Sequence, residues 1–240
     1  MKLSYDLHIH TALSPCGDVD NTPNNIVNMA ALKGLDVIAV TDHNSILNCR
    51  PAIVLGERAG LIVLPGMELT TSEDIHILCL FPDLDCAEKY YAKVDKCRVV
   101  VPNREEIFGR QQILDEMDAE CGVENRLLTV ATTIGVDQAG SLCAECGGIA
   151  VPAHIDKESN SLVSILGALS PDMGYPVVEL SPRCTVAVRH YYASQGYGIL
   201  TNSDAHLLEL ISEPEHFLEC SERSVQGVFE ALKKLGETAK

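Results

Sequence analysis

The chain has 240 residues, of which 46% are hydrophobic and 22% charged, and its formal net charge is -16. An acidic surface of this size repels phosphate backbones and anionic lipids, so we expect neither binding to long nucleic acids nor membrane association. The sequence shows no apolar run of roughly 18 residues and no secretory signal pattern, so its ten cysteines are expected to be free thiols. These features predict a soluble, globular protein of the cytoplasm.

Short apolar runs alternate with helical patterns along the chain. We predict strands at residues 3–9, 36–41, 61–64, 75–81, 149–153, 177–180 and 198–201. We predict helices at residues 23–33, 51–59, 136–146, 162–169, 186–195 and 225–235. Thr22 and Pro23 are typical of a helix start, and Gly34 of a helix end. Apolar strands that alternate with helices indicate an α/β fold with a parallel sheet covered by helices.

The alternation breaks between residues 83 and 137, where the charges are mixed and no clear period is present. We interpret this stretch as an insertion or a small subdomain. The length of the chain suits one large domain, so we expect a single domain over residues 1–240 that carries this insertion.

Histidines and acidic residues gather at the ends of the predicted strands. Six of the eight histidines and two acidic residues occupy such positions: His8, His10, His43, His76, His154, His206, Glu68 and Asp204. The carboxyl ends of the strands in a β/α barrel share one rim, so we expect these side chains to converge there. One histidine at a strand end is commonly an ordinary core or surface residue, whereas six together indicate a site.

The spacing and the side-chain types favour a transition metal. Side chains two residues apart on a strand share a face, so His8 and His10 present their imidazoles side by side. Imidazoles combined with carboxylates suit zinc, iron or manganese better than calcium. Glu68 can bridge two cations, because each of its oxygens can bind one of them.

These motifs resemble those of a known family. HxH at the start, TDHN, GMEL, AHI and SDAH occur in the order found in the PHP (polymerase and histidinol phosphatase) metallo-phosphoesterases, between residue 6 and about residue 206. The resemblance implies a distorted (β/α)7 TIM-like barrel, with two or three divalent ions (Zn, Mn or Fe) at the carboxyl-terminal rim. The implied ligands are His8, His10, Glu68 and Asp204 for one ion, Glu68, His76 and His154 for a second, and His43, His206 and a residue of the first loop for a third.

The first loop, residues 11–22, departs from the family pattern. Family members commonly carry an aspartate ligand at the position that Pro15 occupies here. Counting back from Pro23 makes Asp18 the equivalent ligand, with Asp20 as the alternative. Cys16 is also within reach, although a thiolate is less expected among hard ligands.

Other charged residues could assist the site. Arg183 follows a predicted strand in VVELSPRC and could hold a substrate phosphate bidentately, or it could be an ordinary surface arginine. Lys157 is a second candidate of this kind. Asp42 adjoins His43, and Asp6 shares a face with His8, so either carboxylate could orient an imidazole through its second nitrogen.

The expected activity is hydrolysis of a phosphate ester by metal-activated water, with a small phosphorylated metabolite or nucleotide as substrate and a phosphomonoester preferred. Two alternatives remain open. An amidohydrolase also places HxH on a first barrel strand, but it usually needs a bridging lysine. A regulatory metal-binding protein without turnover could use Cys143 and Cys146 as a sensor.

Overall fold

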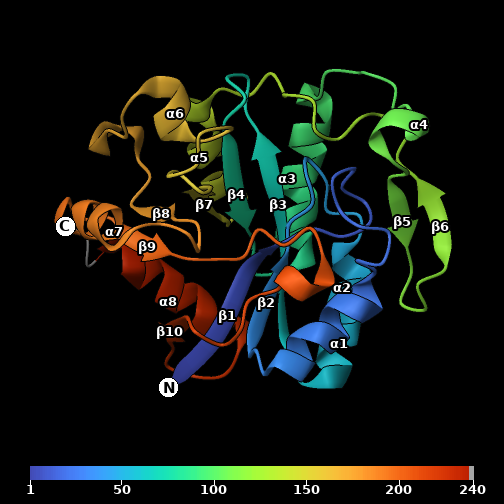
Figure 1. Cartoon of the computed structure of the whole chain (residues 1–240), viewed down its shortest axis with the longest axis horizontal. Coiled ribbons are helices and arrows are strands. Elements are labelled where there is room, and N and C mark those ends of the chain that lie inside the picture. Colours follow the sequence, from blue (N-terminus) through green and yellow to red (C-terminus); the bar gives the residue numbers. More distant parts are fainter. Residues whose placement is uncertain (238–240) are drawn as a thin grey trace.

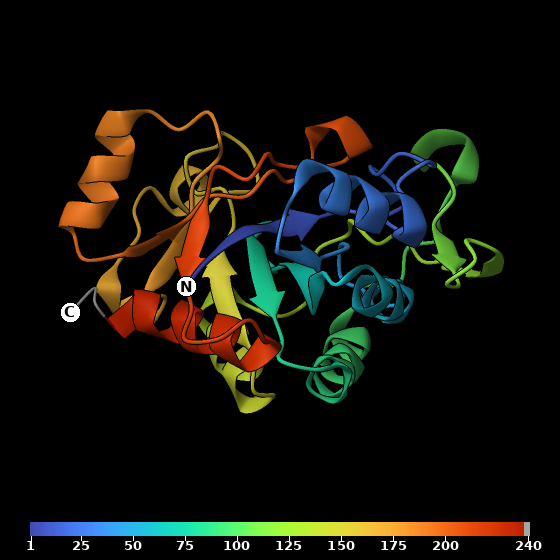
Figure 2. The same cartoon turned by 90° about the horizontal axis from the view of Figure 1, so that it is seen from below.

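A curved six-stranded sheet organises the fold in the computed structural model, which describes residues 1–237 (Figures 1 and 2). The strand order of this sheet is β10-β1-β2-β3-β4-β7, and the pairs β5-β6 and β8-β9 form two smaller sheets. The strands are β1 (Lys2–Ile9), β2 (Val37–Val40), β3 (Ile62–Thr70), β4 (His76–Leu80), β5 (Gln112–Leu114), β6 (Glu120–Val123), β7 (Ile149–Pro152), β8 (Val177–Glu179), β9 (Gly198–Leu200) and β10 (Phe217–Glu219). The α-helices are α1 (Pro23–Lys33), α2 (Cys49–Ala59), α3 (Leu84–Cys97), α4 (Glu105–Phe108), α5 (Val136–Glu145), α6 (Leu162–Leu166), α7 (Val186–Ser194) and α8 (Val225–Glu237).

The predicted strands and helices are confirmed, most of them to within three residues at each end. Helix α1 starts as predicted, because the Thr22 side chain accepts a hydrogen bond from the Asn25 backbone N–H and Pro23 occupies the first turn. It ends at Gly34, whose φ of 81° lies in the left-handed region. Strand β10 was not predicted. No helix within residues 1–237 is long and apolar enough to cross a membrane.

The expectation of a wholly parallel sheet is wrong at β4. Strands β1, β2 and β3 are parallel, but β4 runs antiparallel to both β3 and β7. The reason is the short connection, because only residues 71–75 separate β3 from β4. A parallel crossover needs a dozen or more residues, whereas antiparallel neighbours can be joined by a tight turn. The first residue of β4 therefore lies at the same end of the sheet as the last residues of β3.

Both faces of the sheet are covered, as the apolar strands predict. In β2, Ile38 and Val40 belong to a hydrophobic cluster formed with α1, α2, α3 and α5. Val37 and Ala39 point to the opposite face and belong to a second cluster, which includes residues of α8. This alternation buries β2 completely and leaves the strand ends as the place where polar side chains gather.

The stretch 83–137 forms α3, α4 and the β5-β6 hairpin, and it contacts the first loop (Figure 1). The Gln112 backbone N–H donates to the Ala12 carbonyl at 3.0 Å. The Thr22 hydroxyl donates to the Asp118 carboxylate at 2.6 Å. This stretch therefore supports the loop that leads from β1 to α1.

The segment after β9 returns to the end of β1. Ile9 and Ala205 form a parallel bridge, and the His10 backbone N–H donates to the Ala205 carbonyl at 3.0 Å. This pairing places the residues on either side of Ala205 beside the two histidines of β1.

Candidate metal centre

The eight predicted strand-end residues lie together at one end of the sheet. We call this group the histidine cluster, and its members are His8, His10, His43, His76, His154, His206, Glu68 and Asp204. Glu68 lies within β3 rather than after it. His76 is the first residue of β4, and it reaches the same end as the others because β4 is antiparallel.

Glu68 is the centre of the cluster, with a side chain that is 1% exposed. Its two oxygens lie 2.9–3.3 Å from nitrogens of five imidazoles, those of His8, His10, His43, His76 and His154. Burial would raise the pKa of Glu68, but the surrounding imidazoles outweigh burial and hold this pKa well below its usual value. The carboxylate is therefore ionised, and each of its oxygens faces two or three imidazole nitrogens.

Asp204 adds a second anion on the side of the β1 histidines. Its Oδ1 atom lies 3.2 Å from His10 Nε2 and 3.4 Å from His8 Nε2. Its other oxygen accepts a hydrogen bond from Lys157 Nζ. Asp204 and His154 have φ values of 53° and 32°, a strained backbone region for residues other than glycine, and such strain is commonly found at functional sites.

Several buried polar atoms of the cluster have no hydrogen-bond partner. They are Glu68 Oε2, Asp204 Oδ1, His43 Nδ1 and His154 Nδ1. The first three lie 3.0–3.3 Å from another cluster atom, but without hydrogen-bond geometry. Buried polar atoms are nearly always satisfied, so four such atoms at one place are suited to bind cations. Three sets of ligand atoms lie within 4.8 Å of one another: His8, His10, Glu68 and Asp204; His43, Glu68 and His76; and His10, Cys16, His43 and His206. The donor set fits divalent transition metals.

Glu179, which the sequence analysis missed, orients His8. Both oxygens of this buried carboxylate lie 3.1 Å from His8 Nδ1, which leaves Nε2 directed at Glu68 and Asp204. Glu179 also accepts hydrogen bonds from the His154 backbone N–H and the Asn202 amide. A glutamate inside the apolar strand VVEL was the available signal.

Asp42 and Asp6 contribute differently from the expectation that they orient imidazoles directly. Asp42 Oδ1 accepts a hydrogen bond from the Ser14 hydroxyl at 2.6 Å, and that hydroxyl lies 3.0 Å from His10 Nδ1. Asp42 therefore acts on His10 through Ser14. Asp6 accepts hydrogen bonds from the backbone N–H groups of Ser203 and Ser212, so it holds the segment that carries Asp204.

The imidazoles differ in protonation. Burial opposes the charged form of His10, but hydrogen bonds to Asp204 and Glu68 outweigh it and raise the pKa of His10 to about 9. The charge of Glu68 likewise overcomes burial and raises the pKa of His43 to about 9. Burial and the neighbouring His10 lower the pKa of His206 to about 4. In the metal-free protein, His10 and His43 therefore carry protons at neutral pH. A bound cation would have to displace these protons.

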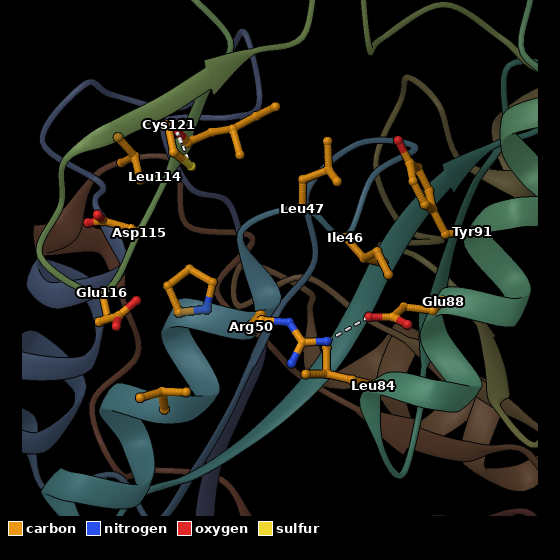
Figure 3. A pocket seen from close by; sticks show the side chains of 13 residues that line it. Ile46, Leu47, Arg50, Leu84, Glu88, Tyr91, Leu114, Asp115, Glu116 and Cys121 are labelled. Carbon is orange, nitrogen blue, oxygen red and sulfur yellow. Dashed lines mark hydrogen bonds and ion pairs between the residues drawn. The ribbon is translucent and has the colours of Figure 1, made fainter.

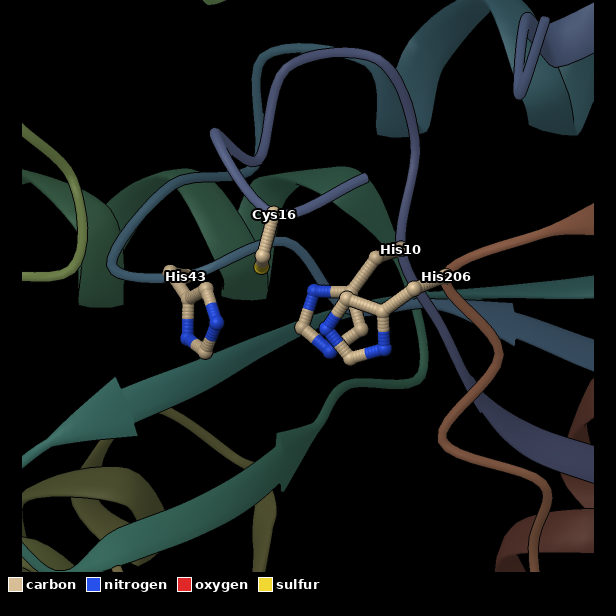
Figure 4. A group of neighbouring side chains, drawn as sticks. All are labelled: His10, Cys16, His43 and His206. Atoms are coloured by element: carbon tan, nitrogen blue, oxygen red, sulfur yellow. The ribbon is translucent and has the colours of Figure 1, made fainter. Parts of the chain in front are cut away.

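The first loop places Cys16, and not Asp18, beside His43 and His206 (Figure 4). Asp18 is absent from the three close sets of ligand atoms in the described chain, and its carboxylate accepts a hydrogen bond from the Asp20 backbone N–H. Asp20 is exposed and also lies outside these sets.

The two predicted phosphate-binding cations lie in different settings. Lys157 contacts Asp204 at the open side of the cluster, with 38% of its side chain exposed. Arg183 is an exposed residue of the loop between β8 and α7. Within residues 1–237, no described interaction joins Arg183 to the cluster. Lys157 is therefore the nearer cation.

Two other features lie outside the cluster. A pocket of about 600 Å³ between α2, α3 and the β5-β6 hairpin is lined mainly by apolar side chains and contains none of the predicted site residues (Figure 3). Cys143 and Cys146 are buried free thiols at the end of α5.

The sequence model of the PHP domain matches residues 6–139, which is more than half of the chain. Five cluster residues lie in this range: His8, His10, His43, Glu68 and His76. The chain belongs to the PHP domain family. The chain is 38% identical over 88 residues to an uncharacterized protein of Methanocaldococcus jannaschii, a match that covers 33% of this chain and 51% of that protein. It is 31% identical over 83 residues to a 5'-3' exoribonuclease of Haemophilus influenzae, covering 33% of this chain and 29% of the enzyme.

The fold of the chain is similar to that of the lesion-specific endonuclease PfuEndoQ from Pyrococcus furiosus. The TM-score is 0.70 at 19% sequence identity, and the match covers 98% of this chain and 56% of that structure. The chain therefore spans about half the length of the first of its curated relatives and of this structural relative.

Proposed function

We propose that this chain is a metal-dependent phosphoesterase that hydrolyses a small phosphorylated metabolite or nucleotide, with phosphomonoesters preferred. The observation that carries the proposal is Glu68, a buried carboxylate whose two oxygens lie 2.9–3.3 Å from nitrogens of five imidazoles. Membership of the PHP domain family supports a phosphoesterase over the other metal-dependent hydrolases that could use such a cluster.

The proposed centre holds two or three divalent ions of zinc, manganese or iron. One position uses His8, His10, Glu68 and Asp204, the set whose ligand atoms lie within 4.8 Å of one another. A second position uses Glu68, His76 and His154, and both imidazoles lie within 3.2 Å of Glu68 Oε1. A third position lies beside His43 and His206.

The protein groups have defined tasks in the proposed reaction. When bound, divalent cations supply Lewis-acid chemistry that acidifies water near neutral pH and neutralises charge on the phosphoryl group. Glu68 and Asp204 offset the charge of the cations. The contacts of His8 Nδ1 with Glu179 and of His10 Nδ1 with Ser14 leave each Nε2 lone pair free for the cluster. Lys157 lies on the open side, where its ammonium can receive a phosphate oxygen.

The preference for small substrates rests on charge. A net charge of -16 opposes long nucleic acids, which bind through many phosphate contacts to basic residues. The names of the relatives include nucleases, so short oligonucleotides belong in any substrate test. A phosphate-binding role for Arg183 stays a prediction. The β5-β6 hairpin supports the first loop beside the cluster, and we propose that the insertion contributes to substrate selection.

We further propose that the sheet and its helices form one domain of the distorted (β/α)7 TIM-like type, with the metals at the rim where the parallel strands end. The bridge between Ile9 and Ala205 supports this arrangement, because it joins the segment after β9 to the first strand.

The test is a panel of phosphate esters assayed with zinc, manganese or iron added to chelated protein. The panel includes p-nitrophenyl phosphate, phosphorylated sugars and amino alcohols, 3'-phosphonucleotides and short oligonucleotides. We expect hydrolysis that depends on metal and is lost in Glu68→Gln. Glu88→Gln serves as the matched control, because Glu88 is an exposed glutamate of α3. Metal binding without hydrolysis of any ester would contradict the proposal.

A further inference from the structure

We propose that the thiolate of Cys16 completes the third metal position, together with His43 and His206. The inference rests on the proposed function, because it assigns a ligand to the same centre. A soft thiolate favours zinc over manganese or magnesium, so this position would be selective for zinc. The sequence predicted a hard carboxylate ligand, Asp18, at this place.

The position of the sulfur supports the assignment. Cys16 Sγ and one ring nitrogen from each of His10, His43 and His206 all lie within 4.8 Å of one another. Figure 4 shows the sulfur directed between His43 on one side and the stacked rings of His10 and His206 on the other. His43 Nδ1 is a buried atom that makes no hydrogen bond of good geometry, although it lies 3.0 Å from Glu68 Oε2. The cysteine is thus one of four convergent donors and does not stand alone.

One of the four donors belongs to another position. His10 Nδ1 is engaged by Ser14, and His10 Nε2 lies 3.2 Å from Asp204 Oδ1, so this ring serves the ion bound by Asp204. Cys16, His43 and His206 remain for the third ion. Three protein ligands with a fourth direction left open are typical of catalytic zinc sites, whereas four protein ligands are typical of structural ones. The third ion would therefore be accessible to substrate.

The first loop is shaped to hold Cys16 over the cluster. The Gly17 backbone N–H donates to the Ser14 carbonyl at 2.9 Å, which closes a turn around Cys16. A Cβ atom on Gly17 would lie 2.3 Å from the Thr11 carbonyl oxygen, so only glycine permits this approach. The Asp18 backbone N–H donates to the His206 carbonyl at 2.9 Å and ties the loop to its neighbouring ligand.

Cobalt(II) provides a test that does not depend on activity. A cysteine bound to Co²⁺ gives a sulfur-to-metal charge-transfer absorption that nitrogen and oxygen ligands do not give. We expect this band in the cobalt-loaded wild-type protein, and we expect Cys16→Ser to abolish it. Asp18→Asn and Cys121→Ser should retain it, and Cys121 is the matched control because it is another exposed free thiol. In the zinc-loaded protein, X-ray absorption should show a sulfur neighbour at about 2.3 Å that Cys16→Ser lacks.

Retention of the band in Cys16→Ser, or its loss in Asp18→Asn, would overturn the assignment of Cys16. If the protein binds cobalt and hydrolyses phosphate esters but shows no band, the thiolate inference fails while the proposed function stands. If chelated protein takes up no divalent metal, both fail.

Discussion

The two sides of the histidine cluster differ in how well they are shielded from solvent. On the side built by β1 to β3, which we call the buried wall, the side chains of His10 and Glu68 are 0% and 1% exposed. On the side built by the segment after β9, which we call the open wall, Asp204 is 13% and His206 30% exposed. The buried wall is therefore part of the core, whereas the open wall is partly accessible to solvent.

The buried wall should be the more sensitive to substitution. Glu68→Gln removes the charge that five imidazoles share, so we expect loss of bound metal and at least about a 1000-fold loss of kcat/KM, or about 4 kcal/mol of transition-state stabilisation. Metal analysis and steady-state kinetics measure these effects, and circular dichroism checks the fold. A variant that kept its metal and its rate would show that Glu68 is not the centre of the site.

The next largest effect should come from Glu179, which contacts His8 on the side away from the cluster. Glu179→Gln weakens the contact with His8 Nδ1, so we expect a loss of about 10–100-fold in metal affinity or activity. Competition with a chelating dye measures the affinity. Glu219→Gln is the control, because Glu219 lies on β10 and is largely exposed. Equal effects of both variants would contradict a role for Glu179 in orienting His8.

The two walls should also respond differently to pH. In the metal-free protein the pKa values of His10 and His43 are raised from 6.5 to about 9. Their contribution to the free energy of unfolding is therefore fully present below pH 6.5 and is lost as the pH rises through about 9. Metal must displace these protons, so its affinity should rise roughly tenfold per pH unit for each proton displaced over this range.

His206 distinguishes the open wall in the same experiment. Its pKa is lowered to about 4, so it is neutral throughout and adds no such dependence. Calorimetric metal titrations at pH 6.5, 7.5 and 8.5 should show a smaller proton release for His43→Gln than for the wild type, and an unchanged release per metal bound for His206→Gln. The reverse order would contradict the assignment of protons to the buried wall.

The open wall should show the smallest effects. Lys157→Gln removes a charge that contacts Asp204 and faces the substrate side, so we expect a loss of about tenfold in kcat/KM, carried mainly by KM, or about 1.4 kcal/mol. Arg183→Gln should change kcat/KM by less, since Arg183 is exposed on its loop. A larger effect of Arg183→Gln would show that this loop moves toward the substrate.

Much of the site could be predicted from the sequence because it depends on strand ends. The positions of His8, Glu68 and Asp204 follow from apolar strands that share an orientation, together with residue types that bind metals. The direction of β4 was also predictable, since residues 71–75 are too few for a parallel crossover.

The remaining features depend on contacts that sequence spacing does not show. Cys16 reaches the cluster because Gly17 packs against the Thr11 carbonyl, a contact within one irregular loop. Glu179 meets His8 across 171 residues of chain, so only the folded sheet brings the two together. Hydrophobic periodicity predicts which face of a strand is buried, but it does not predict which buried polar groups meet.

The central claim is that the histidine cluster holds metal that is required for phosphate ester hydrolysis. The most direct measurement adds zinc or manganese stepwise to chelated protein while bound metal and hydrolysis of p-nitrophenyl phosphate or of a better ester from the panel are followed together. The account predicts that hydrolysis rises with occupancy and levels off at two or three ions per chain. Full occupancy without hydrolysis of any phosphate ester, or equal hydrolysis by the metal-free protein, would contradict it.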